Sequence, residues 1–256
     1  RDRAADTMSK ALMDGVFIFR GTPTPAREYG ETLDAAVGGA LTRAAETVFD
    51  KFHLAPIRPA TDTAAKFISV ERLDRMIREY DPLALATTVA GSPRIDINKP
   101  VLAEVLRVFQ QKAAESGSGR LQGSYLQDLF SAPPYGWTKD TVRYLFAALL
   151  RAGEVEFHKP GEDGVIRTAG EKAAEAVKNT NEFNRVGVSI RDTRPSAEAL
   201  DRAASRLEEL FGIEVLPLED RISAAVRQNI PEVLEKLGAH PARLRLLDLP
   251  GEERAQ

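Results

Sequence analysis

The fold is decided by a short turn, Pro133-Pro134-Tyr135-Gly136-Trp137, which separates two stretches of helical periodicity. The stretch before the turn has apolar residues at the spacing of one helix face: Tyr125, Leu126, Leu129 and Phe130. The stretch after it follows the i, i+3, i+4, i+7, i+8 rule of a buried helical stripe: Val142, Leu145, Phe146, Leu149 and Leu150. The pattern therefore predicts two helices joined by a stiff turn.

A β-hairpin is predicted directly after the second helix. Gly153 favours the left-handed conformation that ends many helices, and Val155 and Phe157 then alternate with polar residues, as in a strand. Turn-forming residues occupy positions 160–164, and a second short strand is expected at residues 165–168. Helix, turn, helix and hairpin together are the outline of a winged helix-turn-helix domain.

The residues before the turn complete this outline. We expect a strand at residues 94–97, which would pair with the hairpin, and a helix over residues 100–115 whose first turn accommodates Pro100. The glycine-rich residues 116–120 are interpreted as a flexible connection. A phosphate-binding P-loop would follow a strand and would carry a lysine after its last glycine, and this stretch has neither feature.

The predicted fold class is mainly α with a small amount of β, and the winged helix-turn-helix domain is assigned to residues 93–170. Residues 1–92 are expected to form a helical segment: a helix at 4–13, a strand at 15–20, a proline-containing loop at 22–26, a long helix from Thr32 and a helix at 70–80. Gly38-Gly39 either breaks the long helix or marks a close helix contact.

Residues 171–256 are assigned to a helical C-terminal region. We expect a helix ending near residue 181, a strand within 183–190, and a helix that begins after Ser196 and stops at Gly212. A helical stretch over 217–237 is interrupted by Pro231, and residues 244–256 run into a tail.

Composition excludes several classes of site. The chain of 256 residues has no cysteine and a net charge of −3, so a disulfide scaffold and cysteine metal sites are excluded. No apolar run approaches the roughly 18–20 residues of a membrane span, and no membrane partner is expected. The three histidines are too far apart in sequence for a zinc site. We expect no catalytic, metal or cofactor-binding residue in this region.

Four cations are the candidate contacts to double-stranded DNA. In helix-turn-helix readers the second helix places its N-terminal residues in the major groove. Lys139 and Arg143 lie at that end of the second helix, and Lys159 and Arg167 lie on the hairpin. Charge argues against this partner, because residues 121–168 contain five basic and six acidic residues and phosphate neutralisation drives non-specific binding. The sequence favours a domain that docks proteins or acts as a spacer.

The turn itself has a structural interpretation. Pro133 and Pro134 stiffen it, Gly136 supplies a permissive backbone conformation, and Tyr135 and Trp137 cap the small core. Full burial of an aromatic side chain stabilises a fold by roughly 1.5–3 kcal/mol. We therefore expect Trp137 to have a core role rather than a ligand contact.

The same stretch carries a family resemblance. Residues 129–143, followed by Ala147-Ala-Leu-Leu-Arg-Ala-Gly153, resemble the large P-loop ATPases of BREX phage-resistance systems, the BrxC/PglY family. Residues 48–52 and 196–211 are compatible with the same region, so the resemblance covers most of the chain. It implies a parent protein that binds ATP and Mg²⁺ and acts in a cytoplasmic antiviral complex with a methyltransferase and other BREX components.

This sequence departs from the family in one respect that decides its activity. It has no G-x-x-x-x-G-K-[ST] motif, so the resemblance implies an internal region whose nucleotide site lies elsewhere in the parent. The leading hypothesis is a non-catalytic winged-helix region that serves assembly of the complex, with DNA engagement as a further candidate role. The alternative is a stand-alone winged-helix transcription regulator that self-associates through its C-terminal helices.

Overall fold

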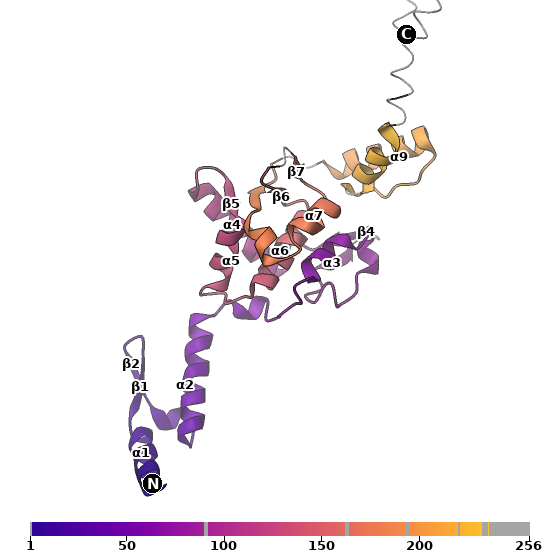
Figure 1. The fold of residues 1–256 in the computed structure, drawn as a ribbon. Coiled ribbons are helices and arrows are strands. Elements are labelled where there is room, and N and C mark those ends of the chain that lie inside the picture. The colour runs from indigo at the N-terminus through magenta and orange to yellow at the C-terminus, as the bar shows by residue number, and fades with distance from the viewer. Residues whose placement is uncertain are drawn as a thin grey trace, which may run out of the picture.

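The computed structural model describes residues 2–89, 92–161, 164–192, 195–219, 221–231 and 235. Figure 1 shows an N-terminal arm that stands apart from a central body, and α9 at the far side of that body. The tail expected at 244–256, and residues 232–234 directly after Pro231, lie outside the described residues. Within the described ranges, no helix is long and apolar enough to cross a bilayer.

The central body contains the predicted helices and hairpin. They are α4 (Pro100–Glu115), α5 (Gly123–Ser131), α6 (Lys139–Arg151), β6 (Val155–His158) and β7 (Val165–Ile166). Thr138 caps the start of α6 by accepting a hydrogen bond from the Thr141 N–H at 3.1 Å. Gly153 follows the end of α6 at a φ of +74°. The predicted fold class, mainly α with a small winged-helix sheet, is confirmed.

The sheet of the central body differs from the prediction in two strands. Its order is β5-β8-β6-β7. β5 (Arg120–Gln122) lies at the end of the stretch interpreted as a flexible connection, and β8 (Gly187–Ile190) comes from the region after residue 170. The pairing expected for residues 94–97 is wrong, because β4 (Ser92–Ile95) pairs with β3 (Ala86–Val89) in a separate hairpin.

The pairing of β5 and β8 is determined by contacts between distant segments rather than by local sequence. β5 has one buried side chain, Leu121, so it shows no alternation from which a strand could be predicted. Val188 of β8 is aligned with Leu121 on one side and with Phe157 of β6 on the other. Three helix-separated segments therefore meet in one sheet, a pairing that no local pattern indicates.

The helix expected at residues 70–80 is wrong as well. α3 (Thr63–Ser69) ends at Val70, whose backbone is extended, and a 3-10 turn, η3 (Leu73–Arg75), follows. Leu73 and Met76 still pack on the core, because a 3-10 turn also brings residues i and i+3 to one face. The apolar spacing identified the buried side chains but not the element that carries them.

The N-terminal arm has a small core of its own, formed by Met13, Ala26 and Ala36. Its elements are α1 (Asp2–Met13), β1 (Val16–Phe19), β2 (Thr22–Pro25), η1 (Ala26–Glu28) and α2 (Leu33–Val48). The loop expected at residues 22–26 is thus largely a strand, and that prediction is wrong. Pro23 and Pro25 fit into it because they occupy alternate positions, at which a strand residue makes no hydrogen bond to its partner.

The C-terminal region is divided more finely than predicted. The single helix expected before residue 181 is two helices, α7 (Glu171–Ala176) and α8 (Thr180–Asn184), because the Asn179 side chain starts a new helix by accepting from the Glu182 N–H. α9 (Ala197–Phe211) begins after Ser196 and ends at Gly212, at a φ of +66°, as predicted. Residues 221–231 are helical.

Helix α2 runs through Gly38-Gly39 without a break, so the expected break is absent. A Cβ on Gly39 would come 2.5 Å from the Tyr29 carbonyl oxygen, whereas a Cβ on Gly38 would meet no atom within 4 Å. The contact is with the residue after η1 rather than with another helix. Gly39 therefore lets α2 pack against the η1 turn.

These two glycines make a matched test. Gly38→Ala should stabilise α2 by up to about 1 kcal/mol, the difference in helix propensity. Gly39→Ala should destabilise the arm, because the Tyr29 carbonyl has to move. Hydrogen exchange of the α2 amides in the two variants measures both effects, and equal protection in the two would contradict the close contact at Gly39.

Candidate interaction site at the helix-turn-helix

Helix α6 is the second helix of the helix-turn-helix, the one that DNA-reading proteins present to the major groove. All ten of its residues from Thr141 to Leu150 are buried. Helices α3, α4, α5 and α8 pack around it. In this structure α6 is a central core helix, and little of it faces solvent.

Helix α3 covers the side of α6 that a DNA reader leaves open. The rings of Phe67 and Tyr144 meet edge to face with centroids 5.3 Å apart. The Arg151 guanidinium donates to the Phe67 carbonyl at 2.6 Å and to the Val70 carbonyl at 2.5 Å. Arg151 therefore satisfies the carbonyls at the C-terminal end of α3 and fixes that helix along α6.

Arg143 is completely buried, and its prediction as a DNA contact is wrong. Its guanidinium donates to the Val177 carbonyl at 2.5 Å, to the Thr61 carbonyl at 3.0 Å and to the Asp140 carboxylate. In an isolated helix Arg143 lies off the apolar stripe and would face solvent. The chain at Thr61 and at Val177 covers that face, and the Arg143 guanidinium hydrogen-bonds to both instead.

The other three candidate cations each pair with a carboxylate. Lys139 is 48% exposed and lies 3.5 Å from Asp128. Lys159 lies 3.0 Å from Glu175. Arg167 lies 2.8 Å from Glu156, while residues 162–163 at the tip of the hairpin lie outside the described residues. Two of these carboxylates, Asp128 and Glu156, are among the six acidic residues counted at positions 121–168.

Residues 133–137 form a joint between the central body and the chain that leaves α2. Trp137 is buried and stacks on Phe130, with the ring centroids 5.6 Å apart. Its indole N–H donates to the Phe52 carbonyl at 3.3 Å, and the Pro134 carbonyl accepts from the Lys51 N–H at 3.1 Å. The sequence predicted the core role of Trp137 but gave no sign of this attachment.

Gly136 is required at this joint for two reasons. Its φ is +65°, a conformation that side chains rarely adopt. A Cβ there would also come 2.7 Å from the Phe49 ring. The ring of Phe49 therefore lies directly against the backbone of the turn.

A charge network braces the same joint. The Tyr135 hydroxyl donates to Glu104 Oε1 at 2.9 Å, Arg107 donates to both Glu104 oxygens at 3.0 and 3.1 Å, and Lys51 lies 3.4 Å away. The hydrogen bonds from Arg107, and then that from Tyr135, lower the pKa of Glu104 to about 2. Burial, and then the bond to Glu104, raises the pKa of Tyr135 to about 12.

A buried carboxylate, Asp81, fixes the β3–β4 hairpin to α6. Asp81 accepts hydrogen bonds from the Leu85 and Ala86 N–H groups, each at 2.8 Å, and from the Tyr144 hydroxyl. Burial, and then the nearby Asp81 charge, raises the pKa of Tyr144 well above its usual range. Both residues were missed by sequence reasoning, because their partners are far apart along the chain.

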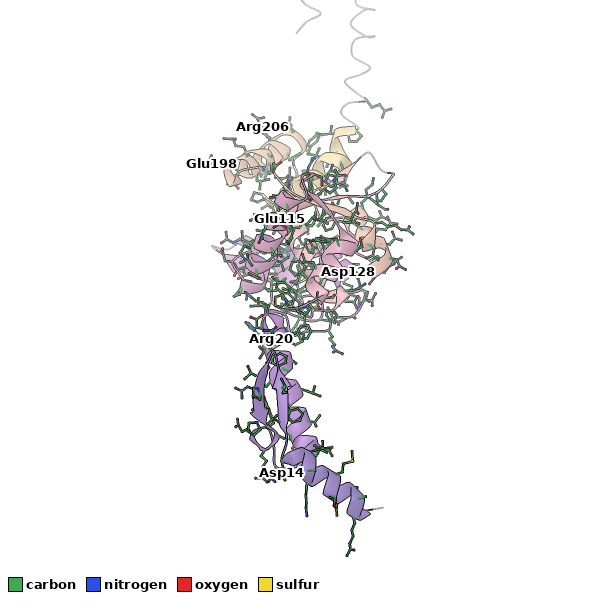
Figure 2. All side chains as sticks on the ribbon, turned by 90° about the vertical axis from the view of Figure 1, so that its left-hand side faces the viewer. Asp14, Arg20, Glu115, Asp128, Glu198 and Arg206 are labelled. Carbon is green, nitrogen blue, oxygen red and sulfur yellow. The ribbon has the colours of Figure 1, made fainter. Side chains whose placement is uncertain are left out.

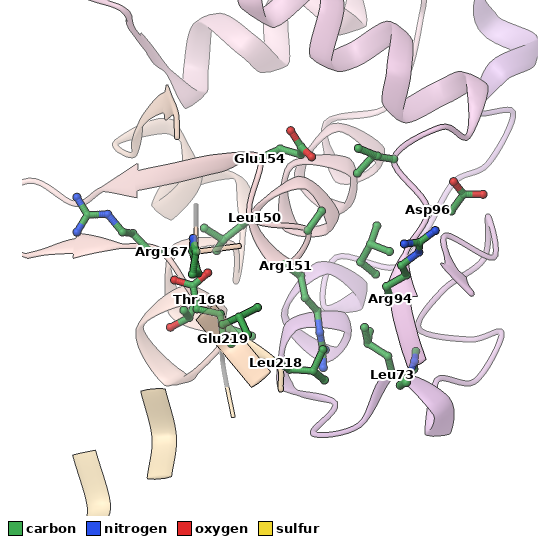
Figure 3. A pocket seen from close by; sticks show the side chains of 18 of the residues that line it. Leu73, Arg94, Asp96, Leu150, Arg151, Glu154, Arg167, Thr168, Leu218 and Glu219 are labelled. Carbon is green, nitrogen blue, oxygen red and sulfur yellow. The ribbon is translucent and has the colours of Figure 1, made fainter. Parts of the chain in front are cut away.

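A cavity of about 350 Å³ opens at the C-terminal end of α6. Figure 3 shows its charged side chains, which include Arg94, Asp96, Glu154 and Glu219. Arg191 holds Glu219 at 2.6 Å. Both signs of charge line the cavity, and the described part of the chain contains no group of three or more potential metal ligands. The lining therefore gives no sign of catalytic or metal chemistry.

The fold and the site define a class: a winged helix-turn-helix domain whose second helix is enclosed by its own chain. Residues 83–192 match the family model described as the BREX ATP-binding protein BrxC winged helix-turn-helix domain. The family resemblance found in the sequence is therefore confirmed for this domain. No curated protein and no solved structure matches the chain.

Arg143 and Lys139 provide a first test of this site. Arg143→Met should lower the free energy of unfolding by roughly 3–5 kcal/mol, because it leaves buried acceptors without a donor. Lys139→Met should change it by less than about 0.5 kcal/mol, as expected for an exposed ion pair. Urea unfolding followed by the fluorescence of Trp137, the one tryptophan, measures both. Similar losses in the two variants would contradict the structural role of Arg143.

Glu104 provides a test by pH. Its folded-state pKa of about 2 lies below its ordinary value of 4.5, so the stabilisation is fully present above about pH 4.5 and is lost as the pH falls towards 2. Glu104→Gln should therefore be less stable than the wild type at pH 7, and this difference should shrink between pH 4.5 and pH 2. Glu46→Gln, at an exposed glutamate of α2, is the control. A difference that stays constant with pH would show that the Glu104 charge is not involved.

Proposed function

We propose that this chain is a non-catalytic assembly region of a BREX-type ATP-binding protein, which uses its winged helix to hold protein segments together rather than to read DNA. The observation that carries the proposal is the burial of α6. Ten successive residues of the helix are buried, and the Arg143 side chain is engaged by Thr61 and Val177. A helix bound in this way does not enter a major groove.

The surface of the arm supports the same role. Six large apolar side chains of the arm are exposed: Met8, Leu12, Val16, Ile18, Val37 and Leu41. Exposed apolar side chains gathered on one part of a protein are typical of protein–protein contacts. Figure 1 shows the arm extending away from the central body, where a partner can reach it.

The wider setting of the proposal follows from the family. The parent protein is an ATPase whose nucleotide and Mg²⁺ sites lie outside this region, and it acts in the cytoplasm in defence against phage. The partners we propose are other BREX components, among them a methyltransferase. In this setting the winged helix links the arm to the rest of the protein.

A measurement of DNA affinity distinguishes an assembly region from a DNA-reading domain. Fluorescence anisotropy of a labelled duplex should show that the full chain binds no more tightly than a Kd of about 10⁻⁴ M at physiological salt, the weak end of non-specific binding. The physical reason is the covered α6 and the pairing of Lys139, Lys159 and Arg167 with carboxylates.

Two charge-reversal variants are compared in the same measurement. The triple variant carries Lys139→Glu, Lys159→Glu and Arg167→Glu. The control is Arg206→Glu, at an exposed arginine on α9 (Figure 2). The proposal would be contradicted if the wild type bound the duplex with micromolar affinity, and if only the triple variant lost this affinity and showed a smaller salt dependence of binding. Purified BREX components supply the positive measurement. At least one should co-sediment with the chain, and co-sedimentation with none of them would also count against the assembly role.

A further inference from the structure

The hairpin of the arm has one open edge and one blocked edge. The Ala26 N–H donates to the Gly15 carbonyl at 3.0 Å. In an antiparallel pair, hydrogen-bonded positions alternate, so Phe17 and Phe19 bond to β2 with their partners Thr24 and Thr22. Val16 and Ile18 consequently direct their N–H and C=O groups away from β2. Within the described chain β1 pairs with β2 alone, and that row of groups is open.

The edge of β2 is blocked by proline. Pro25 lies opposite Val16 and Pro23 lies opposite Ile18, at the positions whose N–H groups would face the outer edge of β2. Proline has no N–H to offer a further strand, and proteins use it to protect sheet edges. The edge of β1 carries neither a proline nor a charged residue, because its sequence is Val-Phe-Ile-Phe. The hairpin is thus protected against pairing on one side only.

The outer face of the hairpin is apolar over its whole width. Val16, Ile18, Pro23 and Pro25 all have exposed side chains, and Ile18 is 70% exposed. The opposite face belongs to the arm itself, where Phe17 packs edge to face on Tyr29 with centroids 5.7 Å apart. An added strand at β1 would extend the apolar outer face without disturbing this inner core.

We propose that the open edge of β1 pairs with β1 of a second copy of this chain, in an antiparallel four-stranded sheet with a two-fold axis at Phe17. In this register Val16 of each copy lies opposite Ile18 of the other. The outward backbone N–H of Val16 then donates to the carbonyl of Ile18 of the other copy, and the N–H of that Ile18 donates to the carbonyl of Val16. Addition of a strand to an open edge is a common mode of protein recognition, and a two-fold arrangement requires a self-complementary surface.

The charges that flank β1 favour a second copy as the occupant. Asp14 and Arg20 stand at opposite ends of β1 (Figure 2), and Asp14 also accepts from the Arg27 guanidinium of its own chain at 2.5 Å. The two-fold register brings Asp14 of one copy next to Arg20 of the other. Arg20 lies over the Phe19 ring, 5.4 Å from its centroid. Like charges would meet in a parallel arrangement, so the charges select the antiparallel one.

The inference rests on the proposed assembly role and names one partner within it. Its measurement is the mass of the isolated chain in solution, which is independent of DNA binding and of other BREX components. The dimer can therefore be absent while the assembly role stands. Failure of the dimer is thus distinguishable from failure of the assembly role.

Sedimentation velocity of the full chain over a range of concentrations tests the pairing. The wild type should form a reversible dimer. Ile18→Pro, which removes one edge N–H and matches Pro23 on the other strand, should weaken the dimer at least tenfold. Ile18→Lys should weaken it similarly, because it places a charge on the edge.

The matched control is Leu210→Lys, which changes an apolar residue of α9 that is 72% exposed but lies outside the arm. It should leave the dimer unchanged. A chain that stays monomeric, or a dimer that neither Ile18 variant weakens, would overturn the proposal. Equal weakening by Leu210→Lys would also overturn it, since the contact would then be general apolar association.

The lack of native cysteine allows a direct test of the register. Val16→Cys and Ile18→Cys variants, mixed in equal amounts and oxidised, should form mostly the mixed disulfide, because positions 16 and 18 face each other across the axis. Identical positions lie on a diagonal roughly 7–8 Å apart, too far for a relaxed disulfide. A statistical mixture of the three disulfides would overturn the register.

Discussion

The buried guanidinium of Arg143 is the interaction on which the central body depends. A charge removed from water needs polar partners, and a buried charge that loses them is strongly destabilising. Arg143 takes its partners from three places: α6 itself, the chain before α3, and the end of α7. Helix α6, whose counterpart in DNA-reading helix-turn-helix domains is exposed to the major groove, is thereby held in the interior of the protein.

The elements that could be predicted from the sequence are those with local signals. Helix α6 has an N-terminal cap, an apolar stripe and a terminal glycine, and all three lie within the residues they control. Strand β8 lies within the strand expected at residues 183–190, but its pairing with β5 and β6 could not be predicted, and β5 could not be predicted at all, because its partner strand lies beyond α5 and α6 in the chain. Arg143 could not be placed for the same reason. Its local position indicates a solvent-facing residue, and only a distant segment makes it a buried one.

The turn at residues 133–137 shows the limit of a correct local prediction. Its core role follows from its aromatic residues, and Trp137 is buried as expected. The contacts of Trp137 with the Phe52 carbonyl and of Gly136 with Phe49 come from a segment more than eighty residues away. The turn on which the family resemblance was noted in the sequence therefore also fastens the arm to the body.

Helix α2 sets how far the arm reaches. Its 16 residues span about 24 Å at the usual helical rise. The hairpin lies beside one end of the helix, and the residues that follow the other end contact the turn beside Trp137. The length of one helix therefore separates the exposed edge of the hairpin from the turn that leads into α6.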